Sequence, residues 1–228
     1  MNHKDQISVP DQLQFHGVLP ALITPFTPDG AAVDGDALTA NVERLIGAGV
    51  GGLVPGGSTG EFTTLSHAER RELVELTVTA AAGRVPVVAG TGALSTEETV
   101  ELSVHAEQAG AAAVMIVPPF YDALSWRELL AHYTAVAERI SIPIMYYNLP
   151  SASGVTLTLE QFRELRAAAN VTVLKDTGGD TTAATELIQA GGGPTRAPLL
   201  PLDDDATAEL AQLLERAGAR LADPVSVS

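Results

Sequence analysis

The feature that most constrains the fold is a regular alternation of short apolar runs with amphipathic helical segments. The apolar runs begin about every 30 residues, which is the length of one βα unit. The expected strands are Gly17–Ile23, Gly52–Gly56, Pro86–Ala89, Ala113–Val117, Ile142–Tyr147 and Val171–Leu174. Apolar strands that alternate with helices predict a parallel sheet covered on both faces.

Helix starts are marked by the capping-box pattern, in which Ser or Thr is followed three residues later by Glu or Gln. Four pairs fit it: Ser66 and Glu69, Ser95 and Glu98, Ser125 and Glu128, and Thr158 and Gln161. Asp34 or Asp36 is expected to start the first helix, and Asp180 the helix after the sixth strand. These signals place a helix between each pair of successive strands.

Functional side chains of parallel α/β folds gather at the carboxyl ends of the strands. Each expected strand is followed by polar or aromatic residues: Thr24, Ser58 and Thr59, Thr91, Phe120 and Tyr121, Tyr147 and Asn148, and Lys175 and Asp176. The pattern therefore predicts one site at this end of the sheet.

Lys175 is the leading candidate for a nucleophile. The other lysine, Lys4, lies in a polar leader, whereas Lys175 ends an apolar strand. A partly desolvated lysine has a lowered pKa and can form a Schiff base with a carbonyl, whereas arginine stays protonated. The alternative is a strand-end lysine whose amine extends into solvent.

Two other segments suggest binding and proton transfer. The loop GGSTGE brings Gly57, Ser58 and Thr59 between a strand and a helix, where backbone N–H groups and hydroxyls suit a carboxylate. It lacks the lysine of a P-loop, and an ordinary βα loop is the alternative. Tyr147 could transfer protons or be a buried structural tyrosine.

Composition limits the partners. The formal net charge of −15 and the lack of a basic run argue against nucleic acid and anionic membranes. Without cysteine there is no thiol chemistry, and the histidines lack metal-ligand spacing, so neither a metal nor a cofactor is expected. No apolar run reaches the length of a membrane span, which predicts a cytoplasmic protein.

Four motifs in sequence, GGSTGE, PPFYD, YYNLPSASG and VLKDTGGD, together resemble the dihydrodipicolinate synthase/N-acetylneuraminate lyase family of class I aldolases. The resemblance covers roughly residues 15–190. It implies a TIM-type (β/α)8 barrel, a pyruvate-dependent reaction and a homo-oligomer.

The resemblance also implies roles for individual residues. Lys175 matches the Schiff-base lysine, and Tyr147 matches the proton-transferring tyrosine. Ser58 and Thr59 match the pair that holds the carboxylate of the pyruvoyl group, with Gly57 beside them. Tyr121 matches the tyrosine that reaches into the site of a neighbouring subunit.

Two departures from the family pattern affect the interpretation. Ala152 stands where the synthase branch has an arginine that binds the aldehyde partner's carboxylate, which favours a lyase. After the sixth helix the chain resembles the family's extreme C-terminus, so units seven and eight look deleted near Gly191–Gly193. We expect a leader (1–14), six βα units (15–190) and a C-terminal segment (191–228) with a helix at Asp203–Gly218.

The sequence leaves three functions open. The first is a Schiff-base lyase or aldolase acting on a small-molecule 2-keto acid. The second is an internally truncated homologue without catalytic activity, and the third is a 4-hydroxy-tetrahydrodipicolinate synthase. An incomplete barrel of about six units would expose strand edges, which predicts association or poor solubility.

Overall fold

The computed structural model describes residues 15–179. Its helices are α1 (Gly35–Gly47), α2 (His67–Ala81), α3 (Thr96–Ala109), α4 (Trp126–Ala137), α5 (Pro150–Ser153) and α6 (Leu159–Ala168), with short 3-10 turns η1 (Ser58–Gly60) and η2 (Phe62–Thr64). Its strands are β1 (Val88–Gly90), β2 (Ala113–Ile116), β3 (Ile144–Asn148) and β4 (Val171–Asp176). The expected leader, the Gly191–Gly193 deletion and the Asp203–Gly218 helix lie outside the described residues and stay predictions.

The strands form a parallel array in chain order. β1, β2, β3 and β4 pair as neighbours, and every pairing is parallel. The first two expected strands extend this array through single parallel bridges, Ala21 with Val54 and Leu53 with Val87. Four of the six expected strands are therefore confirmed as a parallel sheet, and the first two expected strands are present only as single parallel bridges.

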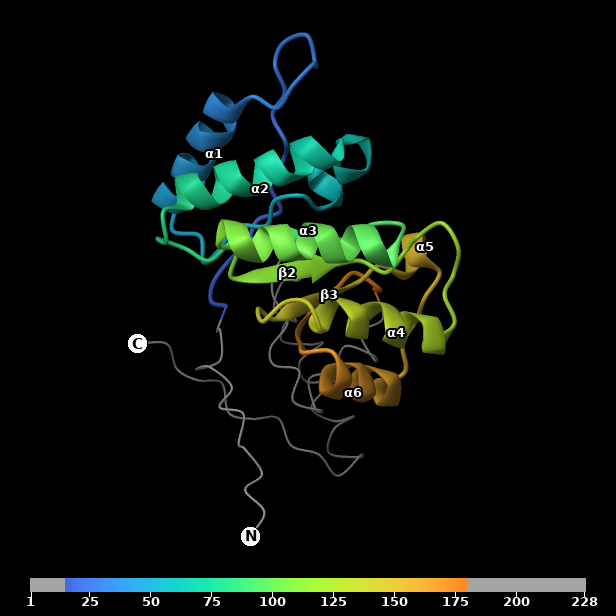
Figure 1. Cartoon of the computed structure of the whole chain (residues 1–228). Coiled ribbons are helices and arrows are strands. Elements are labelled where there is room, and N and C mark those ends of the chain that lie inside the picture. The colour runs from blue at the N-terminus through green and yellow to red at the C-terminus, as the bar shows by residue number, and fades with distance from the viewer. Residues whose placement is uncertain (1–14, 180–228) are drawn as a thin grey trace, which may run out of the picture. The chain divides into compact units, whose positions relative to one another are not determined.

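Helices cover one face of the array. In Figure 1, α3 lies along β2, and the contacts between α3 and β2 agree with this view. Helix α6 contacts β4. The core between them is apolar and includes Val114, Ile144 and Val171 from the strands, with Leu129 and Leu165 from the helices. Alternate strand residues point to the opposite face.

The opposite face has its own apolar cluster. It includes Val88, Met115, Val117, Met145 and Tyr147, and all five are buried. Burial on both faces explains why the strands read as continuous apolar runs in the sequence. Within residues 15–179, no helix is both long enough and apolar enough to cross a bilayer.

Three of the four predicted capping boxes form, at Ser66, Ser125 and Thr158. At α3 the box is only half formed: the Ser95 hydroxyl accepts from the Glu98 N–H, but the Glu98 carboxylate turns to His67 and Arg70. The prediction of a complete box at Ser95 is therefore wrong, because the carboxylate has tertiary partners.

His132 on α4 is a buried histidine in the core. It is 2% exposed, and its Nδ1 lies 2.9 Å from the Thr96 hydroxyl. Its Nε2 has no hydrogen-bond partner among the described residues. Burial lowers the pKa of His132 to about 4, so the folded chain holds this ring neutral.

We predict that protonation of His132 destabilises the fold in acid. The pKa is lower in the folded state than in the unfolded state, so the stability contribution is complete above pH 6.5 and falls as the pH drops toward 4. The loss from this group is about 3 kcal/mol. Urea denaturation between pH 7 and 4 gives the decrease in the free energy of unfolding per pH unit. His132→Leu should make this decrease smaller. The control His16→Leu, at an exposed histidine, should leave it unchanged. Identical slopes in both variants would contradict the prediction.

Candidate functional site

A one-residue irregularity in β4 decides which face Lys175 occupies. Ile144 pairs with Val171, but the next residue of β3, Met145, pairs with Val173, so Thr172 is an extra residue in β4. Because side chains alternate between faces, one extra residue reverses the alternation. Lys175 thus pairs with Tyr147 and lies on the same face, instead of on the helix-covered face.

The register brings two predicted site residues into contact. The Lys175 amine lies 3.7 Å from the centroid of the Tyr147 ring. Tyr147 is 7% exposed, and Lys175 is half-buried. A cation over the face of an aromatic ring is attracted by the ring's quadrupole, so this contact orients the amine.

Hydrogen bonds beyond this pair tie together the ends of β3 and β4. The Asn148 side-chain amide donates to the Asp176 carboxylate at 2.6 Å. Thr177 donates to the Asn148 carbonyl twice, from its N–H at 3.0 Å and from its hydroxyl at 2.8 Å. We call the contact between Asn148 and Asp176 the Asn148–Asp176 bridge. It fixes the strand ends that carry Tyr147 and Lys175.

A small pocket opens on the same face as Tyr147. It is lined by Gly56, Gly57, Ser58, Phe62, Gly90, Gly92, Met115, Val117 and Tyr147. Three predicted site residues, Gly57, Ser58 and Tyr147, therefore share one pocket. Lys175 is not a lining residue, but it contacts the Tyr147 ring.

A side chain that follows the first expected strand, Gly17–Ile23, holds the GGSTGE loop in place. The buried Thr24 hydroxyl donates to the Gly60 carbonyl at 2.7 Å. Gly56 has φ +71°, and a Cβ added to Gly90 would lie 2.2 Å from the Gly56 carbonyl oxygen, so both positions require glycine. Ser58 and Thr59 follow in η1, where both are exposed.

Two other residues singled out in the sequence lie away from the pocket lining. Tyr121 is 86% exposed in the loop after β2. Ala152 is exposed in α5, the short helix that follows β3. The described residues thus bring Lys175 and Tyr147 together but do not bring Tyr121 to them.

Sequence reasoning assigned no role to Arg70 or to the Asn148–Asp176 bridge. Arg70 is 6% exposed and donates hydrogen bonds to the carbonyls of two pocket residues, Gly90 and Gly92. The sequence gives no sign of this burial, because Arg70 lies among the charged residues of a helix that looks surface-exposed. Asn148 was visible as a polar strand end, but its partner depends on the β4 register.

The sequence model of the dihydrodipicolinate synthetase family matches residues 14–193. The chain belongs to this family. Membership and the parallel βα succession together confirm the predicted TIM-type (β/α) barrel fold of the family. The predicted site roles and the predicted domain limits are not decided by this match.

Relatives in the dihydrodipicolinate synthetase family are similar over three quarters or more of this chain. The chain is 48% identical over 197 residues to the 4-hydroxy-tetrahydrodipicolinate synthase of Sorangium cellulosum, covering 86% of this chain and 65% of that protein. It is 46% identical over 173 residues to the enzyme of that name from Agrobacterium fabrum, covering 75% and 58%.

A solved structure with a similar fold is the chloride-inhibited dihydrodipicolinate synthase of Acinetobacter baumannii in complex with pyruvate. It is 36% identical, has a TM-score of 0.75, and is matched over 78% of this chain and 62% of that chain. The chain therefore spans about three-fifths of the length of these relatives.

We predict that the Asn148–Asp176 bridge stabilises the strand ends. Asn148→Ala should lower the free energy of unfolding by about 1–2 kcal/mol, because a hydrogen bond to a carboxylate is lost at a part-buried position. The matched control is Asn41→Ala, which removes an exposed hydrogen bond from Arg44 and should change the free energy by less than about 0.5 kcal/mol. Equal effects in urea denaturation would contradict a bracing role.

Proposed function

We propose that the chain is a Schiff-base-forming lyase or aldolase that uses pyruvate, or the pyruvoyl part of a 2-keto acid, as the imine partner. The observation that carries the proposal is the position of the Lys175 amine, 3.7 Å from the centre of the Tyr147 ring. Membership of the dihydrodipicolinate synthetase family supports it. The activity needs no metal or cofactor, because amine and phenol supply the chemistry.

In the proposed reaction, Lys175 first gives up its ammonium proton, and its amine then attacks the keto carbon and forms a carbinolamine. Loss of water gives an iminium ion, which withdraws electrons from the neighbouring carbon. A C–C bond to that carbon can then break or form, and hydrolysis releases the keto acid. Tyr147 moves protons during carbinolamine formation and dehydration, since its side chain contacts Lys175 and lines the pocket.

The proposed carboxylate site is the GGSTGE loop. Gly57 and Ser58 line the pocket, and Thr59 follows in the same 3-10 turn. Their hydroxyls and backbone N–H groups are donors that suit the carboxylate of pyruvate. Because Tyr121 is 86% exposed, its proposed catalytic contribution requires a second copy of the chain, in a homo-oligomer.

A second candidate is 4-hydroxy-tetrahydrodipicolinate synthase activity, in which the pyruvate imine condenses with a carboxylate-bearing aldehyde. Its supporting observation is the name carried by relatives that are 42–48% identical. Ala152 favours the lyase instead, because alanine offers no positive charge to the aldehyde's carboxylate. Both candidates require the same imine on Lys175.

The first test is reductive trapping. Incubation with pyruvate and borohydride should add one reduced pyruvate to the chain, and peptide mapping should place it on Lys175. Lys175→Arg should abolish the adduct, because a guanidinium group does not deprotonate in this pH range. Lys4→Arg is the matched control and should trap like the parent chain.

Tyr147→Phe refines the same test. It should keep the fold and reduce the rate of trapping by on the order of 10²–10⁴, since proton transfer is lost while the ring remains. An adduct on Lys4 or the N-terminus alone, or none at all, would contradict the proposal and favour the non-catalytic homologue.

The two candidate activities differ in their response to Ala152→Arg. If the chain condenses pyruvate with a carboxylate-bearing aldehyde, the new cation should lower the KM for that aldehyde and leave pyruvate trapping unchanged. Turnover of the aldehyde by the parent chain would establish the synthase. Cleavage of 2-keto acids without such turnover would establish the lyase.

A further inference from the structure

Arg70 on α2 is a buried cation next to the pocket. It is 6% exposed, and burial lowers its pKa to about 10, which still leaves it protonated at neutral pH. Burying a charged group is costly unless hydrogen bonds and opposite charge compensate it. The partners that compensate Arg70 therefore indicate what this side chain does.

Two of these partners are backbone carbonyls at the end of β1. Arg70 Nη2 donates to the Gly92 carbonyl at 2.9 Å and to the Gly90 carbonyl at 3.2 Å. Both glycines line the pocket. The position of this wall is therefore fixed by a side chain from α2, which is not part of the sheet.

A third partner is an aromatic side chain. The Arg70 guanidinium carbon lies 5.1 Å from the centroid of the Phe62 ring, and Phe62 also lines the pocket. Phe62 packs edge-to-face against Phe120 at 5.8 Å. One guanidinium group thus contacts three lining residues, two through hydrogen bonds and one through its ring.

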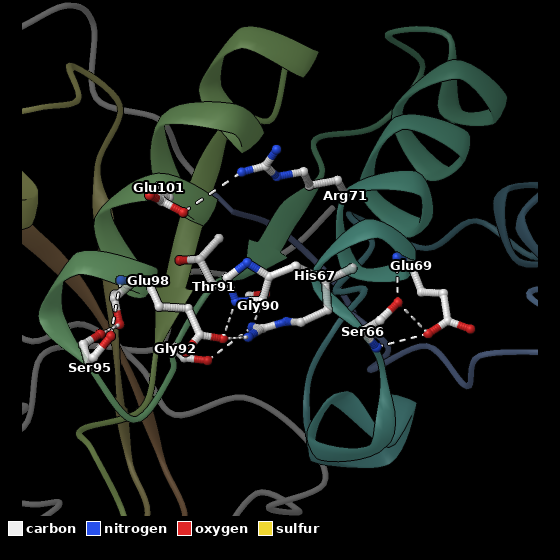
Figure 2. Close-up of polar contacts among 12 residues, drawn as sticks. Ser66, His67, Glu69, Arg71, Gly90, Thr91, Gly92, Ser95, Glu98 and Glu101 are labelled. Atoms are coloured by element: carbon white, nitrogen blue, oxygen red, sulfur yellow. Dashed lines mark hydrogen bonds and ion pairs between the residues drawn. The ribbon is translucent and has the colours of Figure 1, made fainter.

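The opposite charge comes from α3. The Glu98 carboxylate lies 3.7 Å from Arg70 Nη1 and 2.6 Å from His67 Nε2. Figure 2 shows Glu98 and His67 beside Gly90 and Gly92, between α2 and α3. Glu98 makes these contacts instead of completing the capping box at Ser95.

We propose that Arg70 is a positioning residue for substrate binding: it holds the Gly90–Gly92 and Phe62 walls at the spacing that the 2-keto acid requires. This proposal rests on the proposed function, because the pocket is taken as the binding site of the keto acid. Within residues 15–179, the hydrogen bonds and the ion pair of Arg70 go to Gly90, Gly92 and Glu98, and none goes to Lys175, Tyr147 or Ser58. Its effect is transmitted through the pocket walls.

The test compares Arg70→Met, which keeps an apolar stem but removes the charge and donors, with Arg71→Met. Arg71 is the next residue of α2 and has only a loose surface contact, 3.9 Å from Glu101. The pyruvate concentration for half-maximal trapping should rise on the order of tenfold in Arg70→Met and stay unchanged in Arg71→Met. Arg70→Lys, which keeps a cation that can donate to one carbonyl, should give an intermediate value.

Amide hydrogen exchange separates this proposal from the proposed function. The Gly90 and Thr91 amides donate to the carbonyls of Pro55 and Met115, so their exchange reports opening of this segment. Exchange over residues 90–93 should accelerate in Arg70→Met and not in Arg71→Met, with or without pyruvate. If Arg70→Met does not fold, the same comparison is made with Arg70→Lys.

The outcomes are distinguishable. Unchanged exchange over residues 90–93, or accelerated exchange with an unchanged half-saturation concentration, would overturn the positioning role. Failure of the parent chain to trap pyruvate would overturn the proposed function instead. The exchange rates over residues 90–93 would then still show whether Arg70 holds this segment in place. A lower melting temperature with no shift in half-saturation would mean that Arg70 is purely structural.

Discussion

The site depends on the register between β3 and β4. Thr172 is one residue more than regular parallel pairing requires, and it moves every later residue of β4 to the other face. Without it, Lys175 would pair with Asn148 and point to the helix-covered side, where a charged amine would meet an apolar core. With it, the amine lies over the ring of Tyr147.

The surrounding contacts hold this arrangement at several points. The Asn148–Asp176 bridge joins the ends of β3 and β4, and Thr24 holds the GGSTGE loop through the Gly60 carbonyl. In both places, side-chain hydrogen bonds hold the chain where the regular pairing between strands has ended. The pocket walls therefore have defined positions although four of the nine lining residues are glycine.

Much of the fold could be predicted because it is encoded locally. Apolar runs located the strands, and residues such as Ser66, Ser125 and Thr158 marked helix starts. Lys175 and Tyr147 could be selected because residue type and strand-end position suffice to select them. Their contact could not be predicted, since the extra residue Thr172 has no local signal. The prediction of a capping box at Glu98 was wrong because its carboxylate pairs with His67 and Arg70 instead.

The most direct test of this account is a crystal structure of the chain after treatment with pyruvate and borohydride. The account predicts continuous density from Lys175 Nζ to the reduced pyruvate, with the Tyr147 hydroxyl in hydrogen-bond range of the adduct and Thr172 still unpaired in β4. A regular β3–β4 register that turns Lys175 to the helix-covered face, or pyruvate bound without a link to Lys175, would contradict it.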